Sequence, residues 1–188
     1  MSLLLCARHA AVAVTNCCYG RLDLPPGEDP RASASRLSLA LSRTTPLAVW
    51  TSPLRRCGEV ADELARLLKA VLRIDDRLAE IDFGEWEGRG WNEIERRDRV
   101  RYEAWLASWR DVGPPGGESL VAFEGRVRAW AGERGAHGDI ETLALVGHAG
   151  VIRALRVLGA GATWDEALHQ PIPHLEWLAL PIARDSDR

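Results

Sequence analysis

The chain has 188 residues, of which 46% are hydrophobic, and a formal net charge of −3 at pH 7. A chain of this length buries one good core, so we expect a single domain over residues 1–188. Its charge gives no general attraction to nucleic acid or membranes, and its single lysine, Lys69, excludes a Walker-type phosphate loop. The four cysteines lack zinc-like spacing and no apolar stretch approaches membrane-spanning length, so we expect a soluble, cytoplasmic protein with reduced thiols.

Short apolar runs alternate with longer amphipathic segments along the chain. Strands are predicted at residues 2–7, 47–51, 71–74, 142–146 and 175–180. Helices are predicted at residues 30–42, 53–69, 91–109, 119–133, 149–158 and 164–169. Thr163 and Glu166 have the spacing of a capping box for the last helix. The alternation predicts an α/β fold, a three-layer α/β/α sandwich with a mostly parallel central sheet.

Two histidines stand where predicted strands end. Arg8 and His9 follow the first apolar run, and His148 follows the run "LALVG" just before a helix begins. Ligands of such folds bind where strand ends meet helix N-termini, so these residues suggest an anion site with a reactive histidine. The alternatives are a surface arginine beside a hydrogen-bonded histidine at the first position, and a histidine that merely caps its own helix at the second.

The stretch "TSPLRRC" predicts a helix start with Ser52 as N-cap and Pro53 as the first helical residue. Arg55 and Arg56 then lie in the first turn, where cations are disfavoured unless an anion lies near the exposed N–H groups. The two arginines therefore suggest a bound phosphate or carboxylate. Alternatively, both side chains extend into solvent.

Four acidic residues alternate with large apolar ones in "EIDFGEWE", residues 80–87. A carboxyl group packed among such apolar side chains has a raised pKa, as a general acid requires. The alternative is a solvated acidic loop. Two arginines, two histidines and one carboxylate suit phosphoryl transfer through a phosphohistidine, because fixed cations hold the phosphate oxygens and a carboxylic acid protonates the leaving alkoxide. This inventory requires no metal.

The sequence resembles the histidine phosphatase superfamily, the phosphoglycerate mutase-like proteins, over nearly its whole length. The motifs "ARHA", "TSPLRRC", "EIDFGEWEG" and "VGHAG" carry the resemblance in this order, supported by "CYGRLDLP" and "PPGGES". The nearest likeness is to the branch that contains alpha-ribazole phosphatase. The resemblance implies a phosphomonoester hydrolase for a small phosphate ester, with alpha-ribazole phosphate as a candidate, no cofactor, and a monomer or homodimer.

The resemblance also implies roles for particular residues. His9 would be the phosphorylated nucleophile, Glu80 the proton donor and His148 the second histidine. The implied phosphate or substrate ligands are Arg8, Arg56, Asn16, Tyr19 and Gly20. Ala10 stands where the family has glycine, which the catalytic pair tolerates provided that φ at this residue is negative.

Other functions are compatible with parts of this pattern. A cofactor-dependent phosphoglycerate mutase shares the chemistry, although such enzymes generally have longer insertions and a C-terminal extension, whereas this chain ends in the polar "ARDSDR". An inactive module that binds phosphorylated ligands is a third option, which loss of a histidine or of Glu80 would favour. In residues 91–109 an aromatic stripe at helical spacing opposes alternating charges, which predicts a packed stripe with a solvated face; the alternative is a lid over the site.

Overall fold

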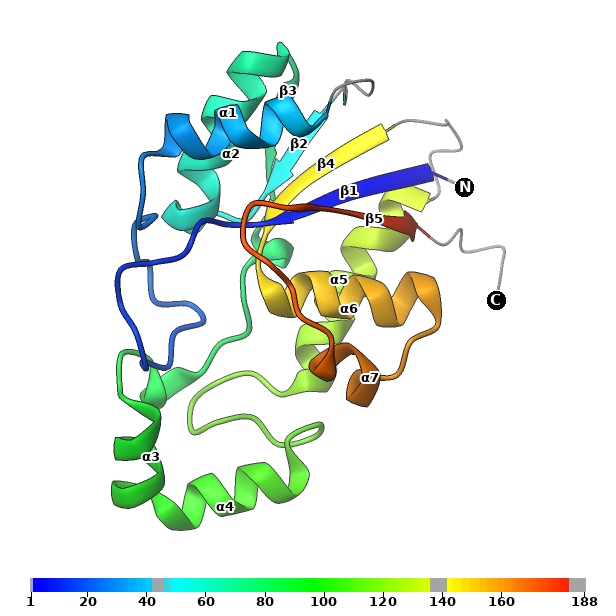
Figure 1. Ribbon diagram of the computed structural model, residues 1–188. Helices are drawn as coiled ribbons and strands as arrows, with labels where there is room; N and C mark the ends of the chain where they lie inside the picture. Colours follow the sequence, from blue (N-terminus) through cyan, green and yellow to red (C-terminus); the bar gives the residue numbers. More distant parts are fainter. Residues whose placement is uncertain (1, 42–45, 47, 136–141, 183–188) are drawn as a thin grey trace.

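The computed structural model describes residues 2–41, 46, 48–135 and 142–182. Within these ranges a single sheet has the strand order β3-β2-β4-β1-β5 (Figure 1). Its strands are β1 (Ser2–Arg8), β2 (Ala48–Thr51), β3 (Val71–Ile74), β4 (Thr142–Gly147) and β5 (Trp177–Ile182). β1 to β4 pair in parallel and β5 runs antiparallel beside β1, which confirms the mostly parallel sheet.

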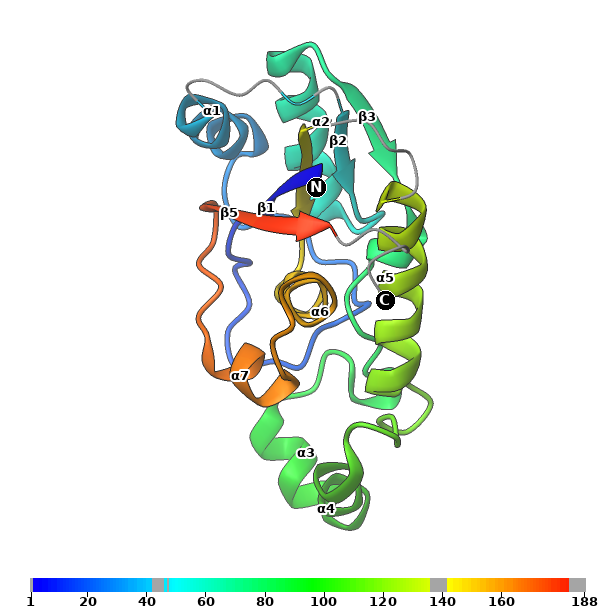
Figure 2. The same cartoon turned by 90° about the vertical axis from the view of Figure 1, so that its right-hand side faces the viewer.

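Helices cover both faces of the sheet (Figures 1 and 2). One layer contains α1 (Pro30–Ala40) and α2 (Arg55–Leu68), and the other contains α5 (Leu120–Gly135) and α6 (Ala149–Ala160). Successive residues of a strand face opposite sides, so in β4 Leu143 and Leu145 pack toward α5 and α6, whereas Ala144 and Val146 pack toward α1 and α2. The three-layer sandwich is thereby confirmed.

The predicted single helix over residues 91–109 is wrong. The structure has α3 (Trp91–Arg97) and α4 (Arg99–Ser108), separated at Asp98. The Asp98 carboxylate accepts hydrogen bonds from Trp86 Nε1 at 2.8 Å and from Arg101 Nε at 2.7 Å. These bonds hold a non-helical residue between the two helices, an arrangement that periodicity alone does not reveal. Both helices lie beyond the strand ends, at the lower end of the molecule in Figures 1 and 2.

The predicted helix cap at Ser52 is also wrong. The helix begins at Arg55 after Leu54, because the Ser52 hydroxyl accepts the Leu54 N–H at 3.2 Å and closes a local turn instead. Arg55 and Arg56 still occupy the first turn of α2. β5 begins later than predicted because Leu175 has a φ of 54°, outside the strand region.

Other predicted elements differ by a few residues or match. The helix α7 (Trp164–His169) has the predicted bounds, and its capping box of Thr163 and Glu166 is confirmed. Two short 3₁₀ turns, η1 (Asp76–Leu78) and η2 (Gly84–Trp86), were not predicted. Residues 42 and 47, which bound a predicted helix and a predicted strand, lie outside the described residues, as does the polar end at 183–188. No helix in the described ranges is long and apolar enough to cross a membrane.

Candidate active site

His9 directly follows β1, an inner strand of the sheet that carries the first motif. Its N–H donates to the Gly147 carbonyl at 2.9 Å and so continues the pairing of β1 with β4. The side chain is only 2% exposed, and its Nδ1 lies 2.6 Å from the Ala10 carbonyl oxygen. A carbonyl can only accept, so Nδ1 carries the proton and Nε2 keeps its lone pair. His9 therefore has the tautomer of a nucleophile.

His148 meets His9 across the ends of two paired strands. It follows β4 directly, is fully buried, and its ring centroid lies 5.3 Å from that of His9 in an edge-to-face arrangement. The Cys57 sulfur lies 3.4 Å from His148 Nε2. Burial raises the pKa of the Cys57 thiol, so this group stays an S–H next to the imidazole. The structure thus brings the two predicted histidines together.

Arginine side chains surround the histidines. Arg56 is fully buried, and its two terminal nitrogens donate to the Leu22 carbonyl at 2.8 Å and the Gly20 carbonyl at 2.6 Å. A terminal nitrogen of Arg8 donates to the Ile172 carbonyl at 3.1 Å. The Nε atoms of Arg8, Arg21 and Arg56 are buried and have no hydrogen-bond partner in the part of the chain that the structure describes. Buried donors without partners are costly, so these three groups indicate a place for an anion.

Both imidazoles are held neutral. Burial lowers the pKa of His9 to about 3, opposed by its bond to Ala10, and the charges of Arg56 and Arg8 lower it further. Burial likewise holds the pKa of His148 well below its ordinary value, with Arg56 and His9 adding to the effect. A neutral His9 can attack phosphorus through its lone pair without first losing a proton.

The depressed pKa of His9 predicts a pH-dependent stability. Since the folded pKa is about 3 and the ordinary value is 6.5, the unfolded chain binds more protons between these values, and stability falls as pH falls. Between pH 7 and 5, His9 should account for a loss of roughly 2 kcal/mol in the free energy of unfolding. Urea unfolding at both pH values should show a correspondingly smaller loss in His9→Gln. Identical losses in the two proteins would contradict this assignment.

Glu87 organises the loop that supports Arg56. Its carboxylate accepts the N–H groups of Gly20, Arg21 and Leu22 at 2.8–3.0 Å, and also that of Phe83 at 3.0 Å. Gly20 has no room for a side chain, because a Cβ there would lie 1.8 Å from the Ile81 carbonyl oxygen. Sequence reasoning missed this role of Glu87, since nothing local in the sequence shows that two distant loops meet.

The Glu80 carboxylate lies against the N-terminus of α6. One carboxylate oxygen accepts the Ile81 N–H and the other accepts the Gly150 N–H, each at 3.1 Å. A Cβ at Gly150 would lie 2.2 Å from the Glu80 carboxylate, so the glycine of "VGHAG" makes space for the acid. The Glu80 carboxylate is therefore hydrogen-bonded to the backbone two residues after His148.

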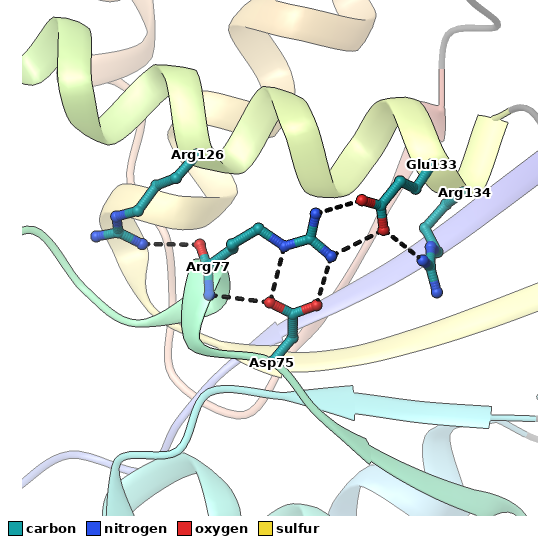
Figure 3. Close-up of polar contacts among 5 residues, drawn as sticks. All are labelled: Asp75, Arg77, Arg126, Glu133 and Arg134. Carbon is teal, nitrogen blue, oxygen red and sulfur yellow. Dashed lines mark hydrogen bonds and ion pairs between the residues drawn. The ribbon is translucent and has the colours of Figure 1, made fainter.

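The backbone before Glu80 is fixed to α5 by an ion-pair network (Figure 3). Arg77 pairs with Asp75 at 2.8 Å and with Glu133 at 2.6 Å, and these bonds raise the pKa of the Arg77 guanidinium. Arg126 on α5 donates to the Arg77 carbonyl at 2.7 Å and to the Glu80 carbonyl at 3.0 Å. The position of the proposed acid is thus set by contacts that lie outside the four motifs.

A cavity of about 480 Å³ lies beside Glu80, and the two histidines are not among its lining residues. Its wall includes Glu80 itself, Tyr19, and Gly150 at the start of α6. The Tyr19 ring also lies under the Arg56 guanidinium, 5.3 Å from ring centroid to Cζ. The aromatic stripe of α3 and α4 lines this cavity as well as packing, through Trp91 and Trp105, on the small cluster around Trp86. The predicted stripe is therefore packed in part, and it also contributes to the cavity wall.

Three further residues lie in the loops that follow β1 or precede β5: Ala10, Asn16 and His174. Asn16 is exposed and adopts a φ of 53°, and no described hydrogen bond connects its side chain to the arginines or histidines. Ala10 is not among the described residues with positive φ, so the condition for replacing the family's glycine is met. Sequence reasoning missed His174, whose Nδ1–H donates to the His9 carbonyl at 2.5 Å and whose ring centroid lies 5.5 Å from that of His9.

The sequence pattern of the histidine phosphatase superfamily (branch 1) matches residues 4–186, and the chain belongs to this superfamily. It is 32% identical over 109 residues to the adenosylcobalamin/alpha-ribazole phosphatase of Salmonella typhimurium, covering 56% of this chain and 52% of that protein. It is also 32% identical over 146 residues to a glucosyl-3-phosphoglycerate phosphatase of Mycobacterium tuberculosis, covering 72% and 64%.

The fold matches that of solved members. The alpha-ribazole phosphatase from Shigella flexneri superposes with a TM-score of 0.85 over 97% of this chain and 95% of that chain, at 22% identity. The chain spans between 22% and 65% of the length of the curated relatives it matches. The likeness to the Shigella structure shows the fold.

Proposed function

We propose that this protein hydrolyses phosphomonoesters through a phosphohistidine on His9. The observation that carries the proposal is a pair of buried, neutral imidazoles enclosed by arginines, three of whose buried Nε groups have no partner in the described residues. Guanidinium donors fit the non-bridging oxygens of a phosphoryl group. Membership of the superfamily and the phosphatase names of the relatives support the same reaction class.

In the first step the lone pair of His9 Nε2 attacks phosphorus, and the bond from phosphorus to the ester oxygen breaks. Arg8 and Arg56 hold the non-bridging oxygens, where charge concentrates in the transition state. Glu80 gives its proton to the departing oxygen, which leaves as the alcohol. His148 lies against His9 and supplies a further contact to the transferring group.

In the second step a water molecule attacks the phosphohistidine. The Glu80 carboxylate accepts the proton of this water, so inorganic phosphate leaves and both His9 and Glu80 return to their starting forms. One water is consumed, and one alcohol and one phosphate are released. The same carboxyl group serves both steps because it faces the cavity through which the alcohol leaves and water enters.

The proposed substrate is a small phosphorylated metabolite, and alpha-ribazole phosphate is the first compound to assay because relatives by sequence and by fold are named for it. A phosphoglycerate mutase would share the first step and pass the phosphoryl group to a second alcohol. We prefer hydrolysis because the named relatives are phosphatases. With 3-phosphoglycerate, release of inorganic phosphate would support a hydrolase, whereas formation of 2-phosphoglycerate would support the mutase.

The proposed chemistry predicts activity without a metal ion. Among the described residues no group of three or more His, Cys, Asp or Glu side chains could hold a metal, and the charge on the phosphate is met by arginines. Hydrolysis of p-nitrophenyl phosphate should therefore persist after exhaustive EDTA treatment. Vanadate should inhibit, because its trigonal-bipyramidal form resembles the transition state. Loss of activity on chelation, with rescue by a divalent ion, would contradict the mechanism.

A further inference from the structure

The 480 Å³ cavity beside Glu80 has a composition that selects the alcohol part of the substrate. Seven of its lining residues are aromatic, and aliphatic side chains such as Leu106 and Leu168 cover much of the rest. Among the described residues that line it, Glu80 and Arg153 are the charged ones. The wall is therefore mostly apolar, with few charged groups to orient a ligand.

The cavity also lies where the leaving group must go. Glu80 protonates the ester oxygen in the proposed mechanism, so the alcohol lies on the Glu80 side of the phosphorus, and Glu80 is part of the cavity wall. Tyr19 connects the cavity with the proposed phosphate site, since it lines the cavity and its ring faces Arg56. The volume is comparable with that of small-ligand sites and can hold a two-ring group.

Charge argues against a small acidic alcohol in this place. A carboxylate on the alcohol would lie in a mostly apolar cavity beside Glu80, with Arg153 as the opposing cation. Arg153 is itself half-buried, and its Nε already donates to the Ala167 carbonyl at 3.0 Å. Burying an additional anion or several hydroxyls here leaves polar groups without sufficient partners, which is costly. A planar aromatic group instead gains from burial and from contacts with the surrounding rings.

We propose that the enzyme prefers phosphomonoesters whose alcohol carries a planar aromatic ring system, which the cavity between α3–α4 and α5–α7 binds. The two walls come from separate parts of the chain: Trp91, Trp105 and Trp109 on one side, and Phe123 and Trp164 on the other. In both views α7 lies above α3 and α4 (Figures 1 and 2). This proposal rests on the proposed phosphatase activity and adds the class of substrate.

The test compares 2-(naphthalen-2-yl)ethyl phosphate, butyl phosphate and phosphoserine as substrates. The first two are primary alkyl esters with similar leaving groups, so a difference between them reports binding of the ring. We expect kcat/KM to be about 30- to 100-fold higher for the naphthyl ester, from burial of its additional apolar surface. Phosphoserine should be hydrolysed no better than butyl phosphate.

Variants locate the effect in the cavity. Trp109→Ala should lower kcat/KM for the naphthyl ester about tenfold and that for butyl phosphate less than twofold. Leu106→Ala, at a half-exposed lining position, gives a second variant that spares the packed core. Val100→Ala is the matched control, since Val100 lies on the same helix, is 81% exposed and does not line the cavity. Unchanged preference in both cavity variants would overturn the proposal.

The outcomes also separate this inference from the proposed function. Equal kcat/KM for the naphthyl and butyl esters, or a preference for phosphoserine, would overturn the substrate class while leaving the phosphatase mechanism in place. Failure to hydrolyse any of the three esters, together with failure on p-nitrophenyl phosphate, would contradict the phosphatase activity itself.

Discussion

His9→Ala should lose about 10⁴- to 10⁶-fold in kcat, the scale seen when an enzyme loses its nucleophile. The reason is geometric: the bond of His9 Nδ1 to the Ala10 carbonyl leaves Nε2 with a free lone pair at the end of β1, where Arg8 has an unpartnered donor. Rapid quench of the wild-type enzyme with a labelled substrate should trap an acid-labile, base-stable phosphoenzyme. His9→Ala should form none.

His148→Ala provides the comparison, because the two rings lie 5.3 Å apart in the same buried environment. In the proposed mechanism the second histidine contacts the transferring group without bonding to it, so His148→Ala should still form some phosphoenzyme, more slowly. If His148→Ala fails to label and His9→Ala labels normally, the two roles are reversed. Circular dichroism and urea unfolding of both variants would confirm that the loss of activity does not come from unfolding.

Glu80→Gln should lower kcat by about 10²- to 10⁴-fold on alkyl phosphates, the usual contribution of general acid catalysis. The loss should be smaller on p-nitrophenyl phosphate, because its leaving group barely needs a proton. The phosphoenzyme should then accumulate, since the variant also lacks the base that activates water. Steady-state kinetics on butyl and p-nitrophenyl phosphates, with quench trapping of the intermediate, measure both effects.

The control for Glu80 must be chosen from the same acidic segment. Glu85 is exposed and pairs with Arg101 at 2.9 Å, so Glu85→Gln should leave both substrates nearly unaffected. Glu87 is unsuitable as a neutral control, because its carboxylate holds the loop that binds Arg56. Equal losses on both substrates in Glu80→Gln, or a larger alkyl-specific loss in Glu85→Gln, would remove Glu80 from the acid role.

Much of the fold could be predicted because the central strands are short, apolar and bounded by clear breaks. The pattern placed β3 and α7 at the observed bounds. It also predicted a mostly parallel sheet between two layers of helices. The break at Asp98 could not be predicted, since it depends on a hydrogen bond from Trp86, a residue outside the helical segment. The wrong cap at Ser52 reflects competition between a local turn and the helix, which composition alone does not decide.

Part of the candidate site could likewise be predicted from the sequence, and part could not. The meeting of His9 and His148 could be predicted because each follows a strand, and the fold brings such points to one edge of the sheet. The choice of Arg56 over Arg55 came from the resemblance to the family. Other residues support the site through contacts between segments that are far apart in the sequence: Glu87, Arg126 and His174. No local pattern marks them, so they become visible only once the three-dimensional arrangement is known.

The segment that forms α3 and α4 lies apart from the residues proposed to act on phosphorus. It has its own small cluster around Trp86 and Ile94, and it contributes no member of the arginine and histidine group. Substitutions at its cavity-lining positions should therefore change which alcohol the proposed enzyme accepts. The rate of bond breaking at phosphorus should change little. In the proposed mechanism, substitutions at Trp91, Trp105 or Trp109 would change one wall of the cavity while the arginine and histidine group stays the same.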